Sequence, residues 1–490
     1  MSLPALGVGV IYTPALQPLL EAEADLVSVV EVEPQTLWTV TGDPAEPYRP
    51  DPAVLDGLLA LPQAKLVHGV GFPVGGSRPP DSRHLPLLVD MIGSLGAPWA
   101  SEHLAFNSGA DAGGTFATGF LLPPLQSPAG AAAAAASIRS TSARLPVPFA
   151  VETGVNYLRP RAGEMSDGAF VAAVAEAADC GIVLDLHNLW ANERNGRQRV
   201  EDVVAELPLE RVWEVHIAGG MEFQGYWLDA HSGEVPAPLL SLARRILPEL
   251  PALRAVIFEI TPTFLVRLGL DGVRRQLAGL GELWERRGSP RPAARRPAPP
   301  ATVTSVEEPG FTPVEWEDAL AALVVGRPPA TPTGPALRSL AGDPGVDVLQ
   351  RLVWNFRSGV LVEALSLTCR LLLLHGGDPL TRELFDGFFL SAPPQLFASV
   401  EAEAFGAYLE ARGPDVPFLP EVLGFERAAI RAVLEGRSQR VPFRFEPMSI
   451  LEPLAVGRLP ESPAPGRYEV EVTPELGAGH SVATGLLSSS

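Results

Sequence analysis

The sequence predicts an α/β protein in which a TIM (β/α)₈ barrel is followed by a mostly α-helical C-terminal domain. Eight short runs of strand-forming residues alternate with helical segments through the first 287 residues. Eight parallel strands separated by helices are the number that closes a TIM barrel, although an open doubly wound sheet remains a competing arrangement. Chemically active side chains also follow these runs, at the strand ends where a barrel carries its active site.

The eight expected strands are short runs rich in strand-forming residues. They cover residues 6–12, 26–31, 65–69, 99–103, 149–152, 182–186, 212–217 and 255–260. Between them, segments 84–95, 166–178 and 238–247 repeat apolar residues every three or four positions, which is the spacing of a helix that packs on one face. The alternation of the two patterns predicts a parallel sheet within a barrel domain at residues 1–287.

After the barrel, the composition changes. The run RRGSPRPAARRPAPPAT begins at residue 286, and such a sequence cannot bury apolar area, so residues 288–312 are expected to form a semi-extended linker. Residues 313–476 are expected to form the α-rich domain, and residues 477–490 a flexible tail. The helical segments expected in this domain are 315–325, 346–374, 381–391, 395–412 and 421–434, and a strand is expected at 467–472.

Charge and composition exclude several classes of partner. With 57 acidic and 37 basic residues, the net charge is −20, so the average field repels a phosphate backbone or an anionic membrane. The most apolar helical stretch, 360–374, is too short for a membrane span and carries Glu363 and Arg370. Cys180 and Cys369 lie far apart in apolar surroundings and are expected to be buried thiols. We therefore expect no nucleic-acid or membrane partner and, since no signal-peptide pattern opens the sequence, a cytoplasmic location.

Polar side chains gather where the expected strands end. They are His68, Glu102, His103, Glu152, Asp185, His187, Asn188, His216, Asp229, His231 and Glu259. Each alone has a structural explanation, such as a hydrogen-bonded histidine or a carboxylate that caps a helix. Together at one mouth they would bury many charges, at a cost of several kcal/mol for each uncompensated charge, and metal cations are the usual compensation. About nine ligands are too many for one ion, so two or three ions are expected, and imidazole with carboxylate suits iron, zinc or manganese. The remaining histidine of this half, His84, opens a helix and is expected to be solvated.

Seven stretches in the first 280 residues carry a resemblance to a known family. They are HGVG at 68–71, SEHLAF at 101–106, VETGVNYL at 151–158, LDLHNLWANERNG at 184–196, HIAGG at 216–220, LDAHSGEV at 228–235 and FEIT at 258–261. In this order they resemble the multinuclear non-haem iron-dependent oxidative enzymes, formerly a domain of unknown function, which include the B component of methanobactin biosynthesis. That family has TIM barrels that bind two or three irons.

The resemblance implies a ligand set and a chemistry. The implied metal ligands are His68, His103, Glu152, Asp185, Asn188, His216, Asp229, His231 and Glu259, of which His68, His103, Glu152 and His216 are also expected to be catalytic. The implied cofactor is ferrous and ferric iron with O₂ as co-substrate. The implied substrate is a residue, often cysteine, in a ribosomally made precursor peptide.

Two positions depart from the family pattern. The family usually has Asn where His187 stands, so His187 is either an additional ligand or a residue that orients one. The segment EVEPQTLW has Pro34 where the family has Asn, which puts the substrate-side contacts of the second strand in doubt more than the metals.

The α-rich domain also bears a faint resemblance to the separate partner protein that binds the leader of the precursor peptide in this family. The stretches that carry it are WNFRSGVLVEAL at 354–365 and PFLPEVLGFERAAI at 417–430. The implied arrangement is a natural fusion of catalyst and peptide-binding partner, in which the tether raises the partner's effective concentration. A helical domain that merely packs on the barrel is the alternative.

Other functions fit the same cluster. A divalent-metal isomerase or endonuclease of the xylose-isomerase-like barrels would share the His, Glu and Asp ligands. The charge disfavours a DNA substrate, and Lys65, the only lysine, is expected at a strand start far from the mouth. A metal-binding scaffold without catalysis is a further alternative.

Overall fold

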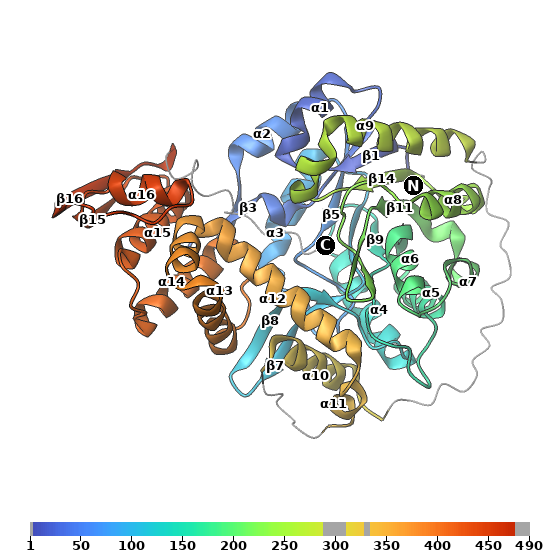
Figure 1. Ribbon diagram of the computed structural model, residues 1–490. Helices are drawn as coiled ribbons and strands as arrows, with labels where there is room; N and C mark the ends of the chain where they lie inside the picture. The colour runs from blue at the N-terminus through green and yellow to red at the C-terminus, as the bar shows by residue number, and fades with distance from the viewer. Residues whose placement is uncertain (1–2, 288–309, 328–333, 476–490) are drawn as a thin grey trace.

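The computed structural model describes residues 3–287, 310–327 and 334–475. Its first part is a closed barrel of eight parallel strands, so the predicted fold class is confirmed (Figure 1). The strands follow one another around the barrel in the order β1-β14-β11-β10-β9-β6-β5-β2. Their bounds are β1 Gly7–Ile11, β2 Val29–Val32, β5 Ala64–Gly69, β6 Ala100–His103, β9 Phe149–Glu152, β10 Gly181–Asp185, β11 Val212–Ala218 and β14 Ala255–Glu259. All eight match strands expected from the sequence.

Helices surround the barrel and cover its apolar outer face. Local sequence sets several of their starts, since Ser127 and Asp51 each cap a helix that has proline in its first turn. The nine helices described for this part are α1 Gln17–Ala22, α2 Pro52–Ala60, α3 Leu85–Leu95, α4 Pro128–Ser142, α5 Asp167–Ala178, α6 Leu186–Arg194, α7 Val200–Glu206, α8 Ala237–Ile246 and α9 Pro262–Arg286.

Three loops at the carboxyl ends of the strands carry antiparallel hairpins. The pair β3 (Trp38–Val40) and β4 (Tyr48–Pro50) follows β2, and β7 (Phe106–Asp111) with β8 (Gly114–Leu122) follows β6. The pair β12 (Met221–Phe223) and β13 (Tyr226–Leu228) follows β11. The mouth of the barrel is therefore built up by additional structure.

The chain beyond residue 309 is mostly helical in its described part. It contains α10 Pro313–Val325, α11 Pro335–Leu340, α12 Pro344–Ala364, α13 Ser366–Ser391, α14 Ala398–Arg412, α15 Leu419–Glu435, β15 Gln439–Phe445, α16 Met448–Ala455 and β16 Pro465–Val472. Within the described ranges no single helix is long and apolar enough to cross a membrane, and only the pair α12 and α13, bent by 107°, reaches that length and composition together.

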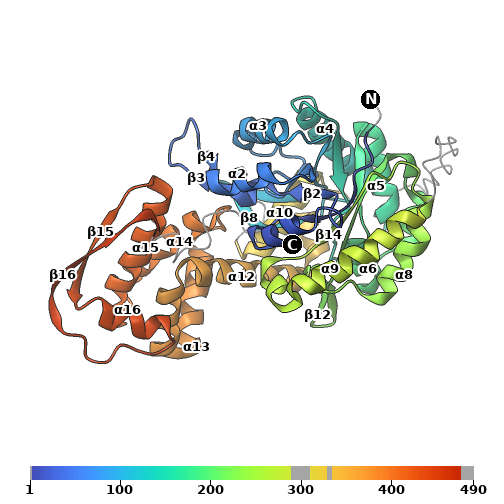
Figure 2. The same ribbon diagram turned by 90° about the horizontal axis from the view of Figure 1, so that it is seen from above.

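These helices contribute to two separate cores. Trp316 and Leu320 of α10 and Leu349 of α12 pack with the β7–β8 hairpin and with the mouth loop that contains Tyr157. The segment from Leu361 to Val472 has an apolar core of its own and projects to one side of the barrel (Figures 1 and 2). The helices α10 and α12 thus form one wall above the barrel mouth.

Some expectations for elements and buried residues were wrong. The helix expected at 346–374 breaks at Leu365, and the segment expected at 381–391 is the end of α13, which kinks at Gly377, where φ is +70°. The strand β15 was not predicted; it pairs with β16, which was. His84 is fully buried, not solvated.

One further expectation is confirmed, since both cysteines are free and buried, as predicted. The expected linker at 288–312 lies outside the described residues up to 309, and the tail at 477–490 lies wholly outside them.

Candidate metal centre

The structure brings all nine predicted ligand residues together at the carboxyl end of the barrel. Parallel register places His103 beside Glu152 and Asp185 beside His216, so these side chains share one layer of the barrel interior. The positions are His68 on β5, His103 on β6, Glu152 on β9, Asp185 on β10, Asn188 in the first turn of α6, His216 on β11, Asp229 and His231 after β13, and Glu259 on β14. Most of these side chains are almost completely buried.

Glu152 is the centre of one half of the cluster. One of its oxygens, Oε2, lies 3.0 Å from His68 Nε2 and 3.1 Å from His103 Nε2. The other, Oε1, lies 3.7 Å from His216 Nδ1 and 3.5 Å from the amide nitrogen of Asn188. Three imidazoles and an amide therefore converge on one carboxylate.

Glu259 is the centre of the other half. Its Oε1 lies 3.0 Å from His216 Nδ1, and its Oε2 lies 3.2 Å from His231 Nε2. The same His231 nitrogen lies 3.0 Å from Asp229 Oδ1. The buried Asp185 completes this half, because one of its oxygens lies within 4.8 Å of ligand atoms of His231 and Glu259.

Two glutamates at the mouth were missed by the sequence analysis. Glu31, at the end of β2, is fully buried, and its Oε2 lies 2.9 Å from His216 Nε2. Glu33 lines the same pocket two residues later. The signal was present, since both belong to EVEP at the end of an expected strand, but Glu31 was counted as a strand residue and not as a side chain beyond it.

Many of these buried atoms have no hydrogen-bond partner although they lie about 3 Å from one another. Such atoms include Glu152 Oε2, Glu259 Oε2, both nitrogens of His216 and His231 Nε2. Asp185 Oδ2 and Asn188 Oδ1 are also buried and unpartnered. The short distances are thus ion pairs between atoms that face a common centre, without the alignment of ordinary hydrogen bonds. Unpartnered buried polar atoms are costly, and a cation between them removes that cost.

The other ring nitrogens orient the imidazoles. His103 Nδ1 donates to the carbonyl oxygen of Gly69 at 3.0 Å, and His68 Nδ1 lies 2.8 Å from Ser101 Oγ. In each ring this leaves Nε2 facing Glu152. Metal-bound histidines are held in this way by a partner on the remote nitrogen.

Electrostatics agree with a site built for cations. Burial and the neighbouring Glu259 and Glu152 carboxylates raise the pKa of Asp185 well above its ordinary value. Burial alone would lower the pKa of His103, but the nearby carboxylates, Glu152 foremost, raise it to about 10. Without cations the cluster therefore has to hold protons, and metal ions would replace them.

Three groups of ligand atoms are compact enough to hold an ion. They are His68 with Glu152 and His216, Glu31 with His216 and Glu259, and Asp185 with His231 and Glu259. His216 and Glu259 each belong to two groups, which is the arrangement expected of neighbouring ions that share ligands. The donor set contains imidazole and carboxylate without thiolate, as the sequence analysis expected for iron, zinc or manganese.

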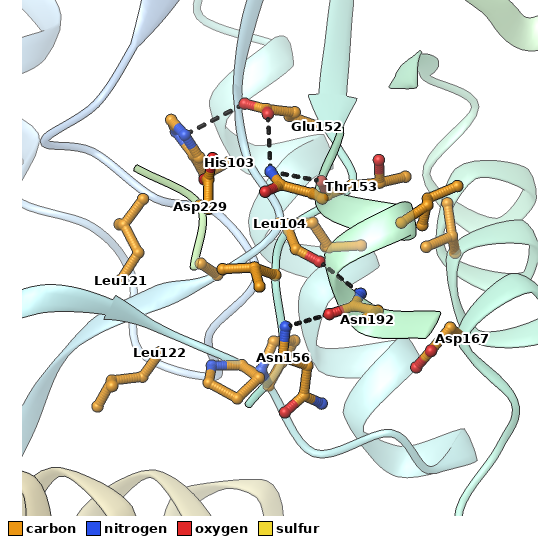
Figure 3. A pocket seen from close by; sticks show the side chains of 18 of the residues that line it. His103, Leu104, Leu121, Leu122, Glu152, Thr153, Asn156, Asp167, Asn192 and Asp229 are labelled. Carbon is orange, nitrogen blue, oxygen red and sulfur yellow. Dashed lines mark hydrogen bonds and ion pairs between the residues drawn. The ribbon is translucent and has the colours of Figure 1, made fainter. Parts of the chain in front are cut away.

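A pocket opens onto this cluster. His103, Glu152 and Asp229 lie at one end, and the pocket extends past Leu121 and Leu122 of β8 toward Asp167 (Figure 3). Its other walls are largely apolar and include Leu104, Phe120, Pro123, Phe170, Val171 and Leu189. The pocket therefore offers a route by which a side chain of a larger substrate can reach the cluster.

The chain matches known proteins over its barrel. Residues 7–262 match the family described as RiPP precursor modification enzyme MbnB/TglH/ChrH, where RiPP denotes a ribosomally synthesised and post-translationally modified peptide. A UPF0276 protein of Streptomyces avermitilis is 33% identical over 181 residues, which are 36% of this chain and 37% of that protein. A UPF0276 protein of Anaeromyxobacter sp. is 33% identical over 177 residues, 36% of this chain and 61% of that protein. The chain thus spans less than two thirds of the length of these relatives. A solved D-psicose 3-epimerase from Clostridium cellulolyticum H10 is 12% identical over 56% of this chain and 98% of its own, with a TM-score of 0.37.

Proposed function

Because the chain belongs to the MbnB/TglH/ChrH family of RiPP precursor modification enzymes, we propose that it is an iron- and O₂-dependent enzyme that oxidises a residue of a ribosomally made precursor peptide. Cysteine is the first residue to test. The observation that carries the metal part of the proposal is the convergence of buried imidazole and carboxylate atoms without hydrogen-bond partners at the barrel mouth.

The residues of this chain divide the work between holding metal and admitting substrate. His68, Glu152 and His216 would hold one ion, with His103 beside them, and Asp185, His231 and Glu259 would hold a second. Glu31 with His216 and Glu259 offers a third position between them. Bound iron would supply the electron transfer and the O₂ chemistry.

The protein around the cluster would control what reaches it. The largely apolar pocket between β8 and α5 excludes bulk water from one side of the cluster and accepts a substrate side chain. Exclusion of water strengthens the interactions that orient the reacting groups. His103 is 17% exposed, whereas His68 and His216 are at most 1% exposed, so the reacting side chain would approach from the side of His103.

The helical region would bind the leader of the same peptide. Its helices α10 and α12 pack on the β7–β8 hairpin and on the mouth loop with Tyr157, so a peptide held on this region starts close to the pocket. The test compares kcat/KM for the full precursor and for its core segment alone, both with the full-length protein. Equal values for the two peptides would contradict leader binding.

The central experiment combines metal analysis with O₂ uptake. Protein purified without air should contain two or three irons per chain, give a Mössbauer signal of coupled ferrous and ferric iron, and consume O₂ only when the precursor peptide is added. His216→Ala should lose the iron and the O₂ uptake. The matched control is His84→Phe, which removes a buried histidine outside the cluster.

The alternatives give different results in the same experiment. A single zinc or manganese ion, with no O₂ uptake and with sugar isomerisation or nucleic-acid cleavage, would replace the proposal with an isomerase or endonuclease. Metal binding without turnover of any of these substrates would favour a scaffold.

A further inference from the structure

His187 lies beside the cluster and has both ring nitrogens engaged. The side chain is fully buried, at the start of α6. Its Nδ1 lies 3.1 Å from Asp229 Oδ1, and its Nε2 lies 3.1 Å from the indole nitrogen of Trp227. Among the described residues the ring makes no other hydrogen bond.

These two contacts fix the tautomer. An indole nitrogen can only donate a hydrogen bond, so His187 Nε2 must accept from Trp227 and carries no proton. In the neutral ring the proton is then on Nδ1, and it points at the Asp229 carboxylate, which accepts it. The one lone pair of the neutral ring is used by Trp227, so no nitrogen of His187 is left for a metal ion.

We infer that His187 is a positioning residue that holds the carboxylate of Asp229 in place for metal binding, an inference that rests on the proposed metal centre. Asp229 Oδ1 lies between His187 and His231, 3.1 Å and 3.0 Å from their ring nitrogens. A donated hydrogen bond from one side restricts rotation of the carboxylate, which is the usual role of a partner behind a metal ligand.

Trp227 is held in place by Asn195 and Arg194. The backbone of Trp227 exchanges two hydrogen bonds with the side chain of Asn195, at 2.8 Å and 2.9 Å. The guanidinium carbon of Arg194 lies 4.7 Å from the centre of the Trp227 ring and 4.9 Å from that of Trp190. The indole is therefore fixed before any metal binds.

Gly220 shows how closely the chain packs around the bond between Trp227 and His187. A Cβ atom at this position would lie 2.3 Å from Trp227 Nε1 and 2.4 Å from His187 Nε2. Any side chain larger than hydrogen would separate the two rings. Only glycine at 220 is compatible with the hydrogen bond between Trp227 and His187.

Two substitutions remove the contacts of His187 with Trp227 and with Asp229 one at a time. In His187→Asn the amide nitrogen can occupy the place of Nδ1 and donate to Asp229, but nothing reaches Trp227. In His187→Gln the amide oxygen can occupy the place of Nε2 and accept from Trp227, but the donor to Asp229 is lost. His187→Leu removes both contacts at similar volume.

The experiment measures Zn²⁺ binding to the metal-free full-length variants by competition with a chromophoric chelator. His187→Leu and His187→Gln should weaken the most affected Zn²⁺ site by about 10- to 100-fold, and His187→Asn should restore most of the affinity. Thermal unfolding of the metal-free proteins shows that each variant is folded.

The outcomes separate this inference from the proposed function. Restoration by Gln and not by Asn would mean that His187 only supports Trp227, and it would overturn the inference. Wild-type affinity in His187→Leu would overturn it as well. Failure of the unsubstituted protein to bind any Zn²⁺ or iron would instead refute the metal centre itself.

Discussion

Buried carboxylates occur in two regions of this protein, and the two regions treat them differently. In the helical region, Glu401 accepts from Arg357 at 2.7 Å and from the backbone of Gln395 at 2.9 Å, one bond for each oxygen. Glu426 likewise accepts from the backbone nitrogens of Leu367 and Thr368, at 2.7 Å and 2.8 Å. Both carboxylates are therefore satisfied by the chain itself.

Several buried carboxylates of the barrel lack a hydrogen-bond partner on at least one oxygen. In the part of the chain that the structure describes, the buried carboxylate oxygens without a hydrogen-bond partner belong to barrel residues, namely Glu31, Glu152, Asp185, Glu214 and Glu259. A buried carboxylate whose oxygens are hydrogen-bonded by the chain contributes to the fold. Buried carboxylate oxygens that face one another without partners instead favour a bound cation. Burial alone therefore does not mark a candidate metal site, whereas buried, unpartnered atoms that converge on one another do.

The strongest test of this contrast is Glu152→Gln. The amide retains the shape but removes the charge on which His68 and His103 converge. We expect metal affinity to fall by roughly a hundredfold or more, with turnover lost in parallel. Equilibrium dialysis followed by elemental analysis measures the loss. A variant that retains its full metal content would break the contrast, because the central carboxylate would then be structural.

The matching change in the helical region is Glu401→Gln. It leaves the guanidinium of Arg357 buried without its counter-charge, since both side chains are only 2% exposed. We expect the free energy of unfolding of this region to fall by about 3 kcal/mol, with metal content unchanged. Urea unfolding and elemental analysis of the same sample give both values. A loss of metal without a loss of stability would reverse the assignment of the two regions.

The pH dependence of the free energy of unfolding tests whether the buried, hydrogen-bonded Glu426 holds a proton. Burial raises the pKa of Glu426 to about 7, and its hydrogen bonds only partly offset this. Because the folded state holds this proton more tightly than the unfolded chain, the associated stability is complete below about pH 4.5 and is lost as the pH rises through 7. Glu426→Gln should remove that part of the slope, on the order of 1–3 kcal/mol between pH 4.5 and 8. Unfolding curves at several pH values measure it, and parallel slopes for variant and wild type would contradict the raised pKa.

The same residue explains why part of the fold was not visible in the sequence. No Gly or Pro marks the break between α12 and α13 at Leu365, and the apolar spacing runs through it. The free backbone groups at the start of α13 are bound by Glu426, about sixty positions later in the chain. A helix start that depends on a distant carboxylate leaves no local signal.

The barrel and the polar residues at its mouth were predictable for the opposite reason. The barrel strands are short local runs, most of them apolar, and parallel strands necessarily bring their carboxyl ends to one mouth. Residues at the ends of the expected strands, such as His103 and Glu152, could be assigned to that mouth without any tertiary information. Glu31 also ends an expected strand, but it was counted as a strand residue, because the sequence does not show to which face of the strand its side chain points.

The smallest effect is expected for the substitution of His84, a buried histidine of the barrel that lies outside the cluster. Like the mouth histidines it is buried with unpartnered nitrogens, yet its neighbours are rings, with centres at 5.6 Å for Trp38, 4.8 Å for Tyr48 and 6.1 Å for Phe72. Burial lowers its pKa to about 4, so the imidazole is neutral at physiological pH and acts as an aromatic ring. His84→Phe should therefore retain the full metal content and change the free energy of unfolding by no more than about 1 kcal/mol. Elemental analysis and urea unfolding provide the measurement. Metal loss in this variant would show that unpartnered nitrogens alone, without converging carboxylates, are enough to recruit an ion.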